Sequence, residues 1–305
     1  MKKKINKIYI AGAGGMLGEA FYNIFSKDFT IKCSDKLSNE QWISKLDFTD
    51  FNNYKKDVEE FGTDYLFHLG AMTDLELCES DPIETFKNNT ESVRHACNIA
   101  HKLNIPILYI GTAGIFDGKK DFYNDDDLPN PLSQYAKSKY ESEKIIENEL
   151  SNYLICRAGW MMGGGEKKDK KFVNKIFQQI KKGAKELNIV GDKNGTPTYT
   201  YDFAKNVLLL INNNIVGKYN LVCEGLTSRI EVGKEILKFY NMDKLIKINK
   251  VDSHFFSKEY FVNRPFSERL INTKLNKLSL NIMRDWKICL KEYLSSEFKL
   301  NNENN

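Results

Sequence analysis

Residues 7–25 read KIYIAGAGGMLGEAFYNIF and join a short apolar run to a glycine-rich turn and a helix-forming segment. The glycines at positions 12, 15 and 18 follow a GxxGxxG pattern. Glycine permits a tight strand-to-helix turn and lets backbone N–H groups approach a pyrophosphate at the helix N-terminus. The stretch therefore predicts a dinucleotide-binding βα unit at the start of the chain. We expect its loop to contact the cofactor through Gly12, Gly14, Gly15, Met16, Leu17 and Gly18.

The next two predicted strands lead to acidic residues. The run 29–34 ends at Asp35, where a carboxylate would accept hydrogen bonds from the ribose hydroxyls of NAD and repel a 2′-phosphate. Lys36 follows directly and could offset that repulsion. Asp47 lies where a third strand would direct a residue toward the adenine, although a solvated helix cap is nearly as good an interpretation. We therefore expect an NAD(P)H cofactor, with NADH slightly favoured over NADPH.

Strands and helices continue to alternate as far as residue 157. We predict strands at 64–69, 105–110 and 153–157, and helices at 81–103 and 135–150. The unbroken apolar run at 105–110 is typical of a strand that is covered on both faces. The acidic segment 121–127 reads as a solvated loop. Together these segments predict an α/β fold with a doubly wound, Rossmann-type parallel sheet.

Small and polar residues follow the buried strands. Gly70, Ala71 and Thr73 follow the run 64–69, Asn89 lies in the next predicted helix, and Thr112 follows the run 105–110. Ligands bind at the carboxyl ends of the strands in open α/β sheets. A lone threonine there is more often structural, but Thr112 precedes a helix that carries acid–base chemistry.

That helix begins in the stretch NPLSQYAKSKYESE, residues 130–143. Ser133 can cap it, and Tyr135 and Lys139, four positions apart, then share one helix face. A phenol has a pKa of about 10, and a neighbouring ammonium lowers that pKa toward the working range of an acid–base catalyst. The pair alone is common in helices, and its position after Thr112 is what makes it a candidate catalytic pair.

The pattern changes after Arg157 and indicates a second lobe. Thr196-Pro197-Thr198 reads as a fixed turn, and the run 218–223 reads as a strand that returns to the first lobe. We predict a dinucleotide-binding domain at 1–157, joined by 199–222. A smaller, mixed α/β substrate-binding lobe would span 158–198 and 223–300, followed by a disordered tail at 301–305.

Composition limits the partners of this chain. The 45 basic and 41 acidic residues leave a formal net charge of +4, which argues against nucleic acid as the main partner. The sequence has no run that approaches the roughly 18 apolar residues of a membrane span. Scattered cysteines and histidines favour reduced thiols and give no metal site. We expect a cytoplasmic protein that does not bind membranes, and a homodimer is one assembly to test.

Motifs spread over residues 11–275 resemble those of extended short-chain dehydrogenase/reductases, most closely the dTDP-4-dehydrorhamnose reductase branch. Each motif alone is unspecific, and their combination carries the resemblance. The matching segments are AGAGGMLG, HLGAMTDLELCESDP, FKNNT, GTAGIFDG, NPLSQYAKSKYESE, RAGWMMGGG, KKFVNKIF, GDKNGTPTYTYDFA and NRPFSERLINTKL.

The resemblance implies an NAD(P)H-dependent reductase of a nucleoside-diphosphate 4-keto-6-deoxysugar. It implies that Tyr135 donates the proton, that Lys139 assists it and binds the nicotinamide ribose, and that Thr112 orients the carbonyl. It places Asn89 among the residues that hold the active-site geometry. The residues on segments expected to face the nucleotide sugar are Thr73, Trp160, Thr196 and Arg264.

Departures from the family pattern lie on the substrate side. Ala113-Gly114 replace an Asp-Tyr pair, Lys171 replaces the asparagine of an NF motif, and Ser267 replaces the asparagine of an RPxNS motif. They leave the particular sugar open. Two alternatives also stay open: an epimerase of the same superfamily, and a non-catalytic NAD(P)-binding regulatory subunit like the partner of methionine adenosyltransferase. The complete set of Thr112, Tyr135 and Lys139 speaks against the second.

Overall fold

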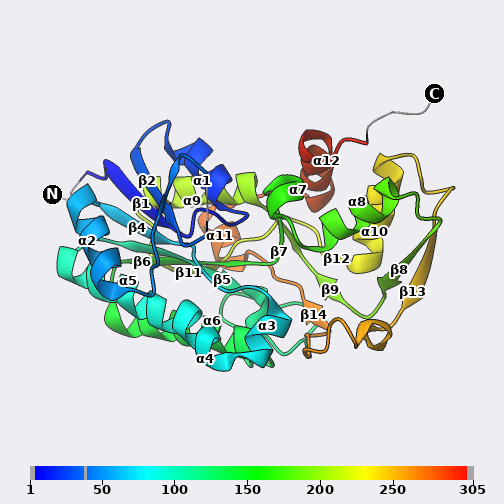
Figure 1. Cartoon of the computed structure of the whole chain (residues 1–305), viewed down its shortest axis with the longest axis horizontal. Coiled ribbons are helices and arrows are strands. Elements are labelled where there is room, and N and C mark those ends of the chain that lie inside the picture. Colours follow the sequence, from blue (N-terminus) through cyan, green and yellow to red (C-terminus); the bar gives the residue numbers. More distant parts are fainter. Residues whose placement is uncertain (1–3, 38–39, 301–305) are drawn as a thin grey trace.

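A computed structural model describes residues 4–37 and 40–300 (Figure 1). Its larger part is built on one sheet, whose strands are β1 (Lys7–Ala11), β2 (Thr30–Asp35), β3 (Ile43–Lys45), β4 (Tyr65–His68), β5 (Ile107–Thr112), β6 (Tyr153–Ala158) and β11 (Gly217–Asn220). They lie in the order β11-β6-β5-β4-β1-β2-β3, and every neighbouring pair is parallel. The predicted doubly wound parallel sheet is confirmed.

Helices cover both faces of this sheet (Figure 1). One layer contains α1 (Gly18–Phe25) and α9 (Thr200–Asn212), and the other contains α2 (Phe51–Phe61), α5 (Ser92–Leu103) and α6 (Gln134–Glu149). Successive side chains of a strand point to opposite faces. Ile8 and Ile10 of β1 therefore pack toward α1 and α9, while Tyr9 and Ala11 pack toward α2 and α5. This two-sided burial explains why the central strands are apolar throughout.

The strand order reverses between β1 and β4. The chain passes from β1 to β2 and β3 on one side, and from β4 to β5 and β6 on the other. A crevice at the carboxyl ends of the strands is expected at such a reversal, and it is the usual ligand site of these folds. The glycine turn after β1, the loop after β4 and Thr112 at the end of β5 all lie at this edge.

The helix predicted at 81–103 is present from Pro82 to Leu103, with a π-helical turn inside it and a separate short helix before it. The structure has α3 (Leu75–Ser80), α4 (Pro82–Phe86) and a π-helical turn (Lys87–Glu91) before α5. Asp81 adopts φ −130° and ψ 78°, since a residue before proline is pushed away from helical geometry. Its carboxylate accepts a hydrogen bond from the Glu84 backbone N–H at 3.0 Å and so caps α4.

A second lobe lies beside the large sheet and contains three small sheets (Figure 1). Its strands are β7 (Trp160–Met162), β8 (Glu186–Val190), β9 (Asn194–Gly195), β10 (Pro197–Tyr199), β12 (Thr227–Ser228), β13 (Lys247–Val251) and β14 (Ser267–Glu268). Its helices are α7 (Gly165–Lys168), α8 (Phe172–Lys181), α10 (Arg229–Phe239) and α12 (Trp286–Glu297), whereas α11 (Thr273–Leu278) lies against β11 of the large sheet (Figure 1). The turn predicted at 196–198 was wrong. Pro197 opens β10, because a strand tolerates proline as its first residue.

Two further features bear on expectations from the sequence, namely membrane-spanning helices and the state of the cysteines. Within residues 4–37 and 40–300, no helix is both long and apolar enough to cross a membrane. All six cysteines are free and buried. The tail at 301–305, predicted to be disordered, lies outside the described residues.

Candidate active site

The glycine turn holds two loops in close contact. Gly12 has φ +83°, and a Cβ atom there would lie 2.2 Å from the Gly70 backbone nitrogen. Gly18 is equally constrained, since its Cβ would lie 1.7 Å from the Ala13 carbonyl oxygen. Gly15 is different: it is exposed, and the nearest atom to its Cβ position lies 3.7 Å away. In the described part of the chain no side chain caps α1, so its first backbone N–H groups are available to an anion.

The acidic residue after β2 is bound to this turn. The Asp35 carboxylate accepts hydrogen bonds from the backbone N–H groups of Gly14 and Leu37, both at 2.9 Å. Lys36 does not pair with Asp35; its Nζ lies 3.0 Å from Asp47 Oδ2. Asp35 and Lys36, the two charged residues at the end of β2, therefore both interact already with other groups of the protein.

Asn89 connects the loop after β4 to α6. Its side chain accepts a hydrogen bond from the Met72 N–H at 2.7 Å and donates to the Met72 carbonyl at 3.0 Å. It also donates to Ser138 Oγ at 3.0 Å. Asn89 lies in the π-helical turn and is fully buried, and such turns occur frequently at functional sites. The contacts fix the loop that carries Gly70 and Ala71 relative to the helix that carries Tyr135 and Lys139.

Tyr135 and Thr112 meet at the start of α6. Ser133 caps this helix by accepting the Ala136 N–H at 3.2 Å, which places Tyr135 in the first turn. Thr112 Oγ1 accepts the Gly114 N–H at 3.2 Å. Burial raises the pKa of the Tyr135 phenol to about 12, and its hydrogen bond with Thr112 acts in the opposite direction.

Lys139 lies one helical turn further along and is only 4% exposed. Its Nζ stands 4.1 Å from the centre of the Tyr109 ring on β5. Burial lowers the pKa of the Lys139 ammonium to about 7, and the negative charge of Glu143 partly offsets that effect. Lys139 therefore loses its proton more readily than an exposed lysine does.

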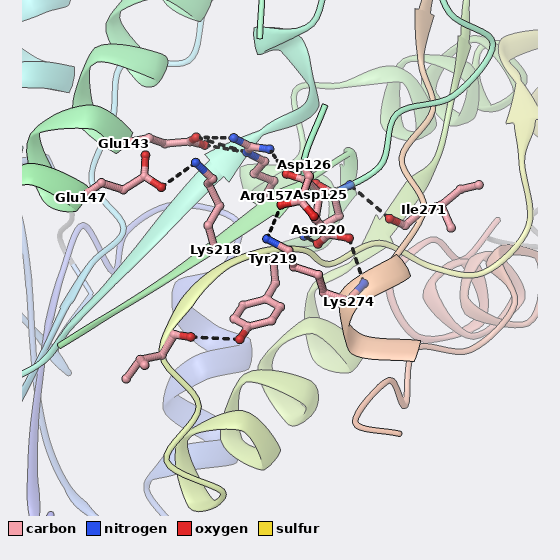
Figure 2. Close-up of polar contacts among 11 residues, drawn as sticks. Asp125, Asp126, Glu143, Glu147, Arg157, Lys218, Tyr219, Asn220, Ile271 and Lys274 are labelled. Atoms are coloured by element: carbon pink, nitrogen blue, oxygen red, sulfur yellow. Dashed lines mark hydrogen bonds and ion pairs between the residues drawn. The ribbon is translucent and has the colours of Figure 1, made fainter. Parts of the chain in front are cut away.

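Glu143 belongs to a buried polar network that the sequence did not predict (Figure 2). Its carboxylate accepts three hydrogen bonds from the Arg157 guanidinium on β6, at 2.7, 3.1 and 3.2 Å. Arg157 also donates to the Asp125 carbonyl at 3.1 Å. The Asp125 carboxylate accepts the backbone N–H groups of Asn220 at 2.6 Å and Lys274 at 3.0 Å.

Asp125 corrects the interpretation of segment 121–127 as a solvated loop, because this residue is 1% exposed. The loop precedes α6 in the sequence. The Asp125 carboxylate accepts hydrogen bonds from two backbone N–H groups that would otherwise be buried without acceptors. The network thus runs from α6 through β6 and β11 to the start of α11.

The predicted substrate-side residues do not all present free side chains. The Trp160 ring packs against two groups: the Arg229 guanidinium lies 3.7 Å from the ring centre, and a Cβ atom on Gly195 would lie 2.2 Å from a ring atom. The Trp160 indole N–H donates to Glu268 Oε2 at 2.9 Å. Thr196 is 1% exposed and accepts the Leu270 N–H at 3.1 Å.

Arg264 and Thr73 lie where the second lobe contacts the segment after β4. Arg264 pairs with Glu76 of α3 at 2.8 Å, and its carbonyl accepts a hydrogen bond from Lys193 Nζ at 2.8 Å. Thr73 is exposed, and its carbonyl accepts Lys171 Nζ at 3.0 Å. Arg229, Lys193 and Glu268 were not predicted from the sequence, because short strands of the second lobe bring them together.

Relatives of known structure share this architecture. A dTDP-4-dehydrorhamnose reductase from Clostridium acetobutylicum superimposes with a TM-score of 0.85 at 28% identity, covering 95% of this chain and 98% of that one. One from Bacillus anthracis, solved in complex with NADP, superimposes with a TM-score of 0.85 at 22% identity, covering 96% and 99%. At 22% identity, the similarity to the Bacillus anthracis enzyme shows only that the two chains share a fold.

Sequence similarity points the same way. A dTDP-4-dehydrorhamnose reductase from Aggregatibacter actinomycetemcomitans is 27% identical over 222 residues, which span 70% of this chain and 69% of the relative. The model of a family described as the RmlD substrate binding domain matches residues 6–298. Since that match takes in nearly the whole chain, the protein belongs to the RmlD substrate binding domain family.

Proposed function

We propose that this protein is an NAD(P)H-dependent reductase that converts the keto group of a nucleotide sugar, a nucleoside-diphosphate 4-keto-6-deoxysugar, to a hydroxyl. The observation that carries the proposal is the placement of Thr112, Tyr135 and Lys139. Thr112 and Tyr135 are hydrogen-bonded at the carboxyl edge of the sheet, on the side of the fold where the strand order reverses, and Lys139 lies one helical turn beyond Tyr135 on α6. The reductase relatives at 27% and 28% identity support the same reaction.

The residues at the glycine turn fit a dinucleotide. Gly15 is exposed with free space around its Cβ position, and the uncapped start of α1 offers backbone N–H groups to a pyrophosphate. Asp35 remains able to accept hydrogen bonds from ribose hydroxyls, because each carboxylate oxygen holds a second lone pair. When bound, the nicotinamide supplies the hydride for the keto carbon.

The protein's own residues supply the proton and hold the carbonyl. Tyr135 gives its phenolic proton to the oxygen of the substrate carbonyl as that oxygen becomes an alkoxide. Thr112 Oγ1 donates a hydrogen bond to the same oxygen and orients it. The Lys139 ammonium stabilises the resulting tyrosinate. Asn89 keeps the loop after β4 and α6 in register, so that the three groups face one reacting centre.

Basic side chains on the second lobe suit the diphosphate of the substrate. The positive charge of Arg264 acts on both Lys193 and Arg229, and each of these also interacts with the negative charge of Glu268, so the three cations share one region. Burial lowers the pKa of the Arg229 guanidinium to about 10, a value at which it stays charged at neutral pH. We propose that this group binds the diphosphate, while Thr73, Trp160 and Thr196 shape the site around it.

The cofactor preference is a finer proposal. Asp35 is held over the glycine turn and would repel a 2′-phosphate, whereas Lys36 is paired with Asp47 and so offers less compensation. We therefore propose use of both cofactors with a slight preference for NADH. Ser38, another candidate phosphate ligand, lies outside the described residues.

The decisive experiment is NAD(P)H oxidation by the purified protein against a panel of 4-keto nucleotide sugars, with the C4 configuration of the product determined by NMR. Reduction of at least one member supports the proposal. A product that is epimerised without net cofactor oxidation would favour the epimerase alternative, and tight NAD(P)H binding without any turnover would favour a regulatory subunit.

A further inference from the structure

We propose that Glu268 is a substrate-orienting residue, whose carboxylate accepts a hydrogen bond from a hydroxyl group on the sugar carbon next to the keto carbon. This inference rests on the proposed function and extends it to the recognition of the sugar itself. Glu268 lies on β14 in the second lobe, 156 residues from Thr112 by the numbering of the chain, and the fold brings the two together.

The position of the carboxylate follows from two contacts. Oε2 accepts the Trp160 indole N–H at 2.9 Å, which fixes the side chain. Oε1 lies across Gly114 from Thr112: a Cβ atom on Gly114 would be 3.5 Å from Glu268 Oε1 and 3.5 Å from Thr112 Oγ1. A single carbon-sized group can thus contact both oxygens at once. Gly114 stands where the related reductases have a tyrosine, and the absence of that side chain leaves this space open.

The charges around Glu268 favour a ligand-facing carboxylate over a structural ion pair. Lys193, Arg229 and Tyr135 all sense its negative charge. Among the described residues, however, no cation lies within ion-pair distance of Glu268, although nearby Arg264 and Arg269 are both paired with other acids. Of its two carboxylate oxygens, Oε2 accepts the Trp160 N–H, and Oε1 has no ion-pair partner among the described residues.

The chemistry of the substrate gives that oxygen a role. If Thr112 and Tyr135 hold the keto oxygen, the space across Gly114 belongs to the next ring position, where a sugar carries a hydroxyl. A carboxylate is an acceptor only and matches that donor, and a hydrogen bond to a charged group is stronger than a neutral one. Glu268 would then select sugars with a hydroxyl beside the ketone and fix the ring face that the carbonyl presents.

The test compares the wild type with Glu268→Gln on the sugar that the panel identifies and on its analogue that lacks the neighbouring hydroxyl. We expect Glu268→Gln to lower kcat/KM for the full sugar by about 10- to 100-fold, the range for losing a hydrogen bond to a charged group. The KM for NAD(P)H should not change. The wild type should lose a similar factor on the deoxy analogue, and Glu268→Gln should lose little more.

The pH profile provides a second readout. The negative charge of Glu268 raises the pKa of Tyr135, so Glu268→Gln should move the limb of the kcat profile that belongs to Tyr135 toward lower pH. The other titratable group that acts on this phenol, Cys78, is unchanged in the variant. An unchanged limb would show that the charge of Glu268 does not reach the phenol, against the placement of its carboxylate beside the reacting groups.

Glu231→Gln is the matched control. Glu231 lies in the first turn of α10 and accepts hydrogen bonds from Thr227 and Ser228, both at 3.1 Å. These two residues form β12, which belongs to the same small sheet as β14. Glu231→Gln should behave as wild type. Equal losses by Glu268→Gln on both sugars, or kcat/KM within twofold of wild type, would overturn the inference. If the wild type reduces no sugar, the proposed function fails. Calorimetric affinity for the full and deoxy sugars then still decides whether Glu268 reads the hydroxyl.

Discussion

Glu143→Gln should destabilise the protein far more than the same substitution at Glu147, four residues further along α6. Glu143 and its partner Arg157 are 0% and 1% exposed, and three hydrogen bonds join them. Removing one member of such a buried pair leaves an uncompensated charge and typically lowers the free energy of unfolding by about 3–5 kcal/mol. Glutamine can still accept one hydrogen bond from the guanidinium, so we expect the lower end of that range.

The control pair, Glu147 and Lys218, is also an ion pair of a glutamate with a basic side chain, but it is more exposed (Figure 2). Glu147 pairs with Lys218 at 2.5 Å, but their side chains are 29% and 21% exposed. Pairs that reach solvent contribute about 0–1 kcal/mol. The structure therefore predicts a difference of roughly 2 kcal/mol or more between the two variants.

The assay is equilibrium unfolding in urea, which gives the midpoint and slope for the wild type and both variants. A double variant, Glu143→Leu with Arg157→Met, should recover most of the loss, because apolar replacement of a whole buried pair is often neutral. If Glu143→Gln is no less stable than Glu147→Gln at equal slopes, the reasoning from burial is refuted.

Three further predictions concern the proposed site. Tyr135→Phe should retain cofactor binding and lose turnover by about 100-fold or more, the range for a lost general acid, and near-normal kcat would remove Tyr135 from the mechanism. Lys139→Met should weaken cofactor binding. Since burial lowers the pKa of Lys139 from 10.5 to about 7, the unfolded chain binds more protons between those values. Wild-type stability should accordingly rise with pH across that window, and the rise should shrink in Lys139→Met, as followed by urea unfolding at several pH values. Asp35→Ala should shift the ratio of kcat/KM values toward NADPH, and a wild type that already favours NADPH tenfold would contradict our reading of Asp35.

The large sheet was predictable because its signals are local. Runs such as 8–11 and 105–110 are apolar, since both faces of the strand are covered, and Gly18 is required by its contact with Ala13 in the same turn. Tyr135 and Lys139 are close because a helix joins them. The start of the helix predicted at 81–103 also had a local signal, since Asp81 caps α4 and separates it from the short helix α3.

What the sequence did not reveal depends on contacts between distant segments. Acidic composition suggested that 121–127 is solvated, yet Asp125 is buried because the backbone of Asn220 and Lys274 needs acceptors there. Arg157 and Glu143 belong to different elements, and no spacing rule pairs them. Glu268 lies in a two-residue strand, too short to be recognised by periodicity.

Two carboxylates act on the residues of the proposed catalytic pair. The buried Glu143 acts on Lys139, and Glu268, which we propose to face the substrate, acts on Tyr135. Glu268 raises the pKa of the phenol, which keeps the proton on Tyr135, as a donor to a carbonyl requires. A phenol with a pKa of about 12 is nevertheless a weak acid at neutral pH, so its anion needs a cation beside it. In the proposed mechanism Lys139 supplies that cation, which requires its charged form, and Glu143 is the neighbour whose charge favours that form against burial. The same arrangement makes the site a better proton donor than acceptor at neutral pH, which suits reduction of the ketone more than oxidation of the alcohol.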